Sequence, residues 1–119
     1  MAIEHDPIRD QIAAEMIEEA ARVFSEDGTA ILARDLLNNY RYRFITTARF
    51  ALYKALYNLK PNYMQVGRWL NKDHTSVMYG VPVAERRMQT DKEFAQAVWR
   101  ITQFGRNRLA EIEADFVTS

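Results

Sequence analysis

The chain has 119 residues and contains no cysteine, two histidines, four glycines and three prolines. The absence of cysteine excludes disulfides and every cysteine-based metal site. The two histidines, His5 and His74, are too few to supply a zinc site, so we expect no metal and no other cofactor. The sequence also lacks a run of about 18 apolar residues and a basic start followed by an apolar stretch, which predicts a cytoplasmic protein with no membrane partner.

Glycine is also missing from the pattern that nucleotide-binding loops need. The chain holds no G-x-x-x-x-G-K-[ST] motif, and 119 residues are too few for an ATPase module with its own sheet. We therefore expect one domain that spans residues 1–119. An enzyme that uses Asp73 and His74 as acid and base would also need a nucleophile, a metal set or a phosphate loop, and none accompanies them, so we expect no catalysis.

Charge is balanced over the whole chain but unevenly distributed along it. The sequence holds 16 basic and 16 acidic residues, yet residues 1–33 carry eight acidic and two basic side chains, whereas residues 34–72 carry one acidic and eight basic side chains. A basic segment of this kind is typical of a phosphate-binding face. Attraction between neighbouring helices of opposite charge would explain the same pattern, so both interpretations stay open.

Apolar residues recur at helical spacing throughout the chain, which predicts an all-α fold of five to six helices. Asp6-Pro7 begins the first helix as its cap and first-turn proline, and Asp27-Gly28 ends it. The other predicted elements are a second helix capped by Thr29, a third over residues 47–59, a fourth capped by Asn62, a fifth opened by Asp73, and a last helix opened by a capping box at Thr90 and Glu93.

Pro82 lies inside the fifth predicted helix. Its ring removes a backbone amide and clashes with the carbonyl of Met78, which costs about 3 kcal/mol unless the helix kinks or breaks. We therefore expect a bend near Gly80. The apolar side of this helix comprises Val77, Val81, Ala84 and Met88, which leaves another side to solvent or to a partner.

The most informative stretch runs from Gly67 to Val77 and reads G-R-W-L-N-K-D-H-T-S-V. A short apolar helix over residues 63–70 ends at Asn71-Lys72, and a second helix opens with small polar groups. Two helices joined in this way are typical of a helix-turn-helix, in which the second helix reads base edges in the major groove. Asp73 also suits the plain role of a helix cap, which is compatible with reading a cytosine amino group.

The segment K-D-H-T-S-V-M-Y resembles the R-D-H-T-T-V-L-H signature of the C-terminal DNA-binding domain (domain IV) of the DnaA family of bacterial replication initiators. The preceding V-G-R-W-L is similar to that family's I-G-x-x-F, and A-R-D-L-L-N-N-Y-R-Y-R to its D-L-L-S-x-x-R-S-R segment. The resemblance covers residues 8–104 and leaves 105–119 as a helical extension. It implies a Trp-repressor-like helix-turn-helix fold, standing alone without the initiator's ATPase module.

The resemblance also implies a function. Double-stranded DNA would be the partner, possible sites would be like initiator boxes, the location would be nucleoid-associated, and the role would be to regulate replication initiation or transcription. The residues expected to read bases are Arg49, Lys72, Asp73, His74, Thr75 and Ser76. Either Arg49 or the loop that carries Arg41 and Arg43 would enter the adjacent minor groove. The residues expected to hold phosphates are Arg41, Arg43, Lys54, Lys60 and Arg68.

Some residues depart from the family pattern. The turn from Gly67 to Asp73 is one residue shorter, and Lys72 replaces an arginine whose planar fork can bind guanine or phosphate with two bonds. These departures, together with Pro82, leave open a second interpretation. In that interpretation the chain is a protein-interaction module with a degenerate helix-turn-helix, and its acidic first helix or long last helix is the working surface.

Two further groups of apolar residues are the aromatic residues and the apolar stripe of the last helix. Aromatic residues at helical spacing usually supply buried area. We therefore expect these rings in the core or at its edge: Tyr40, Tyr42, Phe44, Trp69, Tyr79 and Trp99. Leu109, Ile112 and Phe116 continue the apolar stripe of the last helix, which predicts either a homodimer through that helix or packing against the first helix.

Overall fold

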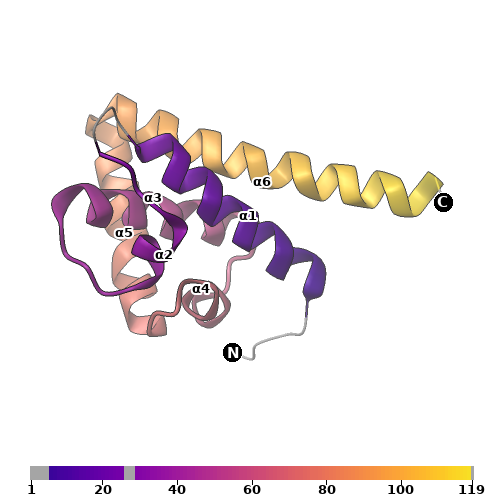
Figure 1. Cartoon of the computed structure of the whole chain (residues 1–119), viewed down its shortest axis with the longest axis horizontal. Coiled ribbons are helices and arrows are strands. Elements are labelled where there is room, and N and C mark those ends of the chain that lie inside the picture. The colour runs from indigo at the N-terminus through magenta and orange to yellow at the C-terminus, as the bar shows by residue number, and fades with distance from the viewer. Residues whose placement is uncertain (1–5, 26–28, 119) are drawn as a thin grey trace.

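The computed structural model describes residues 6–25 and 29–118, and these residues form six α-helices. The helices are α1 (Pro7–Phe24), α2 (Ala33–Leu37), α3 (Arg43–Leu59), α4 (Tyr63–Leu70), α5 (His74–Thr90) and α6 (Lys92–Thr118). Helix α3 contacts each of the other five helices (Figure 1). The predicted all-α fold is therefore confirmed for the described part of the chain, and none of its helices combines the length and apolarity that crossing a membrane requires.

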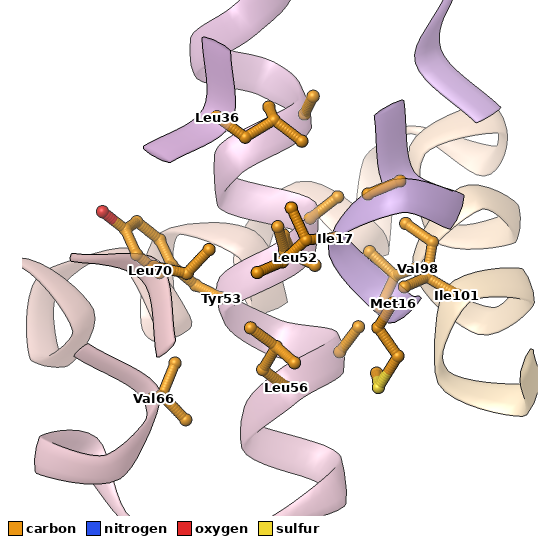
Figure 2. Close-up of a cluster of buried hydrophobic side chains, with 14 of the residues drawn as sticks. Met16, Ile17, Leu36, Leu52, Tyr53, Leu56, Val66, Leu70, Val98 and Ile101 are labelled. Atoms are coloured by element: carbon orange, nitrogen blue, oxygen red, sulfur yellow. The ribbon is translucent and has the colours of Figure 1, made fainter. Parts of the chain in front are cut away.

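The hydrophobic core lies around α3. Leu52 and Leu56 of α3 are fully buried, and Figure 2 shows apolar side chains from α1, α4 and α6 gathered around them, among them Met16, Val66 and Ile101. Burying a large aliphatic side chain stabilises the fold by about 1.5–3 kcal/mol. Because every neighbouring helix contributes to this one cluster, the packing on α3 fixes how the other helices are placed.

Three predicted helix caps are confirmed. The side chains of Asp6 and Asn62 accept hydrogen bonds from the backbone amides of Arg9 and Gln65, at 3.0 and 3.1 Å. The Asp73 carboxylate accepts one from the backbone amide of Thr75, at 3.0 Å. Such side chains satisfy amides that have no partner inside the helix, which is why these sequence signals locate helix starts reliably.

Two predicted caps are wrong. Helix α2 begins at Ala33, so Thr29 does not cap it, and the backbone amide of Leu32 instead donates to Asp35 Oδ2 at 2.9 Å. At the start of α6 the cap is Asp91, which accepts from the backbone amide of Phe94 at 3.0 Å, and Thr90 ends α5. The end predicted for α1 at Asp27-Gly28 lies outside the described residues, and α1 ends earlier, at Phe24.

Helix α3 begins at Arg43, four residues before its predicted start at Thr47. The earlier start takes Arg43 and Phe44 out of the predicted loop and into the first turn of the helix. It also places Arg49 in the second turn rather than the first. The residues that precede α3, from Asn38 to Tyr42, form the link from α2 (the α2–α3 link).

Helix α5 continues without a break through Pro82. Gly80 has a packing role, because a Cβ atom built there would lie 2.4 Å from Cδ2 and 2.8 Å from Cε2 of Tyr53. The ring of Tyr53 is buried, with 5% of its surface exposed, and lies against the backbone of α5. Gly80 therefore allows α3 and α5 to approach closely. This close approach explains why a glycine, which disfavours helical structure, occupies a position inside α5.

Helix α6 lies along α1 (Figure 1). Arg108 Nε donates to Glu15 Oε1 of α1 at 2.7 Å, and Leu109 and Ile112 pack against the core. These two residues of the stripe are therefore partly buried within the fold, on a helix that lies along α1. The end of α6 projects past the other helices in Figure 1, and Phe116, 65% exposed, lies on that projecting end.

We predict that Gly80→Ala destabilises the protein by about 1–3 kcal/mol, because a methyl group must displace the buried Tyr53 ring. Helix propensity alone predicts the opposite sign, a gain of about 1 kcal/mol. Denaturant unfolding measures the difference. In the Tyr53→Leu background the same substitution should cost much less. Stabilisation by Gly80→Ala in the wild-type background would contradict the close contact.

Candidate nucleic-acid interface

The turn between α4 and α5 has a tightly defined backbone. Asn71 adopts the left-handed conformation, with φ 56° and ψ 43°, and ends α4. The Lys72 amide then donates to the carbonyl of Gly67 at 2.8 Å. A Cβ atom at Gly67 would lie 2.6 Å from the Lys72 carbonyl oxygen, so only glycine permits this approach of the turn to α4. The turn thereby sets where α5 begins.

The first turn of α5 presents polar groups to solvent. Asp73, His74, Thr75 and Ser76 are all exposed, and the buried side of the helix starts only at Val77. Asp73 is held as a cap, and the hydrogen bond from the Thr75 amide keeps the pKa of its carboxyl below the ordinary value. His74 Nδ1 lies 3.1 Å from Asp73 Oδ1. Four consecutive hydrogen-bonding side chains therefore lie at the start of α5, where the turn holds the backbone in a fixed conformation.

Arg49 does not lie on the surface, contrary to its predicted minor-groove role. Its side chain is 8% exposed, and its guanidinium donates to four backbone carbonyl oxygens at 2.7–3.2 Å. The acceptors are the carbonyls of Asp35, Leu36, Asn38 and Tyr40. Burial lowers the pKa of Arg49, but an arginine stays protonated in proteins, so the charge is held by these carbonyls. Arg49 is a structural residue.

Lys72 shares this task. Its Nζ donates to the carbonyl oxygens of Leu37 and Asn38, both at 2.9 Å. Burial first, and then the charge of Arg49, lowers the pKa of Lys72. Together Arg49 and Lys72 bind five carbonyls between Asp35 and Tyr40, an arrangement that we call the carbonyl clamp. The ammonium predicted to read bases is thus engaged inside the protein.

The two predicted phosphate-binding lysines, Lys54 and Lys60, also have partners or acidic neighbours within the protein. Lys54 Nζ lies 3.1 Å from Glu85 Oε2, and its side chain is only 17% exposed. Lys60 is half-buried near Asp6, whose pKa is lowered chiefly by the backbone amide of Arg9 and to a smaller extent by the Lys60 charge. Lys60 also follows the end of α3, a helix length of about 25 Å from Arg43. Both lysines therefore have acidic neighbours within the fold: Lys54 is paired with Glu85 of α5, and Lys60 lies near Asp6.

The three arginines that were predicted to bind phosphate are accessible at the surface. Arg41, Arg43 and Arg68 are exposed, and within the described part of the chain their side chains have no hydrogen-bond or ion-pair partner. Arg68 lies in the last turn of α4, close to the turn. Arg41 belongs to the α2–α3 link, which starts at Asn38, and the carbonyl of Asn38 accepts from Lys72 in the turn itself. The clamp therefore brings the link to the same side as the start of α5.

Sequence reasoning missed the exposed aromatic residues. Tyr40, Tyr42 and Phe44 are 50%, 64% and 42% exposed, so the prediction that they lie in the core or at its edge is wrong. The same holds for Tyr79 of α5 and for Trp99 of α6, which are 67% and 65% exposed. For Tyr40, Tyr42 and Phe44 the sequence did contain a signal of exposure. These rings alternate with arginines in Y-R-Y-R-F, and two arginines cannot be buried between rings. Trp69 is half-buried as expected, and its Nε1 donates to Asp10 at 2.8 Å.

The chain matches no protein-family model, and comparisons with curated proteins and with solved structures find no match either. The evidence on function therefore comes from the residues of this chain. Three groups of them lie together around the carbonyl clamp: the polar first turn of α5, the unpaired arginines and the exposed rings of the α2–α3 link.

We predict that Arg49→Met destabilises the protein by about 2–4 kcal/mol, because several buried carbonyls lose their donor. Arg49→Lys should recover only part of this loss, since one ammonium cannot replace a planar fork with five N–H groups. The matched control is Arg68→Met, an exposed and unpaired position, which should change stability by less than about 0.5 kcal/mol. Equal effects of the two methionine variants in denaturant unfolding would contradict the clamp.

Proposed function

We propose that this protein binds double-stranded DNA sequence-specifically through α4 and α5, which act as a helix-turn-helix. The first turn of α5 would enter the major groove, with His74 and Thr75 nearest the base edges. The observation that carries this proposal is the exposed polar end of α5. Four hydrogen-bonding side chains stand there on a backbone fixed by Gly67 and Asn71, and none of them is needed for the core.

The unpaired arginines supply the electrostatic part of the proposal. Arg68 would hold a phosphate beside α5, and Arg41 and Arg43 would hold phosphates or enter the adjacent minor groove, in place of the buried Arg49. Lys72 would act indirectly by keeping the turn against the α2–α3 link. This assignment revises the set of residues taken from the family resemblance but retains its mechanism.

The wider role follows from the same resemblance. A stand-alone reader of this kind, without catalysis, would be nucleoid-associated and would regulate replication initiation or transcription, by occupying sites like those of the initiator or by controlling promoters. Selection of bound sites from a pool of random duplexes identifies the target, because an enriched motif establishes specific binding and gives its sequence. Failure to bind any duplex at low salt would instead favour the protein-interaction module.

One observation favours that second candidate. Phe116 and Val117 are 65% and 85% exposed on the projecting end of α6, a pair of apolar side chains that the described fold does not cover. In this second candidate the end of α6 would bind another protein, and the partner that we propose is a second copy of the chain, which would form a homodimer. Sedimentation of the intact chain and of Phe116→Ser at high concentration tests it, and a monomer in both cases would exclude this homodimer.

For DNA binding we predict that His74→Ala or Thr75→Ala costs about 1–3 kcal/mol on the selected site and little on random duplex, because lost base contacts affect only the specific complex. The matched control is Thr90→Ala, an exposed threonine at the other end of α5, which should leave both affinities unchanged. Parallel losses on both duplexes in a titration with labelled DNA would mean that His74 and Thr75 do not read bases.

Arg68→Ala should change DNA binding in a different way from His74→Ala and Thr75→Ala. It should weaken binding to both duplexes about equally and make the log-log salt dependence shallower by about one unit, as expected for a phosphate contact. Arg106→Ala, which removes an exposed arginine on α6, serves as the control for net charge. If both variants change the salt slope equally, Arg68 has no specific phosphate contact.

We further predict that Asp73→Asn raises affinity for random duplex and reduces discrimination between the two duplexes. Asparagine is as good a cap as aspartate, so α5 keeps its start, whereas a charge that is repelled by phosphate is removed. The comparison with Asp73→Ala separates capping from charge, because only alanine should lower the melting temperature. Unchanged affinity in Asp73→Asn at low salt would place Asp73 outside the interface.

A further inference from the structure

The α2–α3 link and the start of α3 expose a row of aromatic rings. The centroids of Tyr40 and Tyr42 lie 6.2 Å apart, and those of Tyr42 and Phe44 lie 6.0 Å apart with an angle of 18° between the ring planes. All three rings are between 42% and 64% exposed. We call these three residues the aromatic row. Exposing so many neighbouring rings to water is unfavourable, which makes a row of this kind a candidate binding surface.

The backbone beneath the row is held in place. The carbonyl of Tyr40 accepts from Arg49 Nη1 at 3.2 Å, and the amide of Tyr40 donates to Asn38 Oδ1 at 3.1 Å. Two residues after Tyr40 comes Tyr42, the cap residue of α3, which makes no side-chain capping bond, and α3 begins at the next residue, Arg43. The rings therefore stand on a fixed backbone, so binding a ligand there would not require the link to be ordered first.

Cations alternate with the rings. Arg41 and Arg43 lie between them in sequence, and both are exposed without a partner among the described residues. Arg43 and Phe44 also line a cavity of about 680 Å³, to which Arg87 and Arg100 contribute guanidinium groups and Phe94 a further ring. Asp91 and Glu93 line it as well, and Asp91 Oδ2 accepts from Arg87 Nε at 3.2 Å, so Arg43 and Arg100 are the cations there that no carboxylate within the described residues engages. This volume lies in the usual range for small-ligand sites, roughly 300–1,000 Å³. The row thus leads from the link into a cavity that contains rings and cations together with two carboxylates, one of them paired with Arg87.

We propose that the aromatic row and this cavity bind single-stranded nucleic acid. Unpaired bases would stack on the rings, Arg41 and Arg43 would hold the phosphates between them, and one nucleotide would occupy the cavity. Rings along a positively charged path suit single strands because every base has an exposed aromatic face once it is unpaired, whereas duplex bases are already stacked. Purely apolar partners would leave the two guanidinium groups without counter-charges, which makes them a poorer fit.

This inference does not rest on the proposed reading of duplex DNA. Stacking would depend on Tyr40, Tyr42 and Phe44, whereas base-edge reading would depend on His74 and Thr75 at the start of α5. The two proposals therefore fail separately. Tyr42→Ala should weaken single-strand binding alone, and Thr75→Ala should weaken specific duplex binding alone.

The test is fluorescence anisotropy of labelled oligo-dT and oligo-U of about twelve nucleotides, titrated with the full chain at low salt. We expect binding of at least one oligonucleotide, and a preference between them identifies DNA or RNA as the ligand. Tyr42→Ala should weaken binding about tenfold, and Tyr42→Trp should retain it, because a larger ring preserves stacking. The matched control is Phe116→Ala, which removes a ring of nearly equal exposure from the far end of α6 and should have no effect.

Several results would overturn the proposal. One is the absence of binding to both oligonucleotides by a chain whose circular dichroism shows intact helices. Another is an equal loss of affinity in Tyr42→Ala and Phe116→Ala. A third is binding to vesicles that contain phosphatidylserine, lost in Tyr42→Ala, without any binding of oligonucleotides. That outcome would assign the aromatic row to a lipid surface instead.

Discussion

The carbonyl clamp is the interaction on which the rest of the structure depends. Arg49 reaches the carbonyls of residues 35–40 from α3, and Lys72 reaches them from the turn before α5. A largely buried cation is costly unless hydrogen bonds surround it, so the clamp can be released only if other acceptors replace these carbonyls. It therefore holds three segments together: α2 with its link, the core helix α3, and the turn that starts α5.

The distribution of ion pairs explains how a chain without net charge retains a basic face. Carboxylates of α1 are engaged within α1 or with α4 and α6: Glu15 pairs with Arg108, Glu19 with Arg22, and Asp10 accepts from Trp69. Attraction between the acidic and basic segments, the alternative account of the charge pattern, therefore acts at the start of α1, where the pKa of Asp6 is lowered chiefly by the backbone amide of Arg9 and to a smaller extent by the Lys60 charge. It is not what engages Glu15 or Glu19. The arginines of the link and of α4 consequently keep their positive field at the surface.

Much of the fold was predictable because its causes are local. Apolar spacing located the helices, and Asp6, Asn62 and Asp73 marked three helix starts, since a cap depends only on the next few residues. The start of α3 was less predictable. No capping side chain marks it, and Tyr42 ends the link with backbone geometry alone, so the sequence pattern placed the helix one turn too late.

By itself the sequence determined the all-helical fold, the polar first turn of α5 and the concentration of basic residues before it. Only the tertiary structure decided which of these residues are accessible. The carbonyls that bury Arg49 lie 9 to 14 residues away along the chain, and those that bind Lys72 lie 34 and 35 residues away. Helical periodicity cannot reveal such contacts, because it gives the face of a helix and not the partner that meets it. For the same reason helical spacing did not reveal that the rings of Tyr40, Tyr42 and Phe44 are exposed, although aromatic residues at such spacing usually supply buried area.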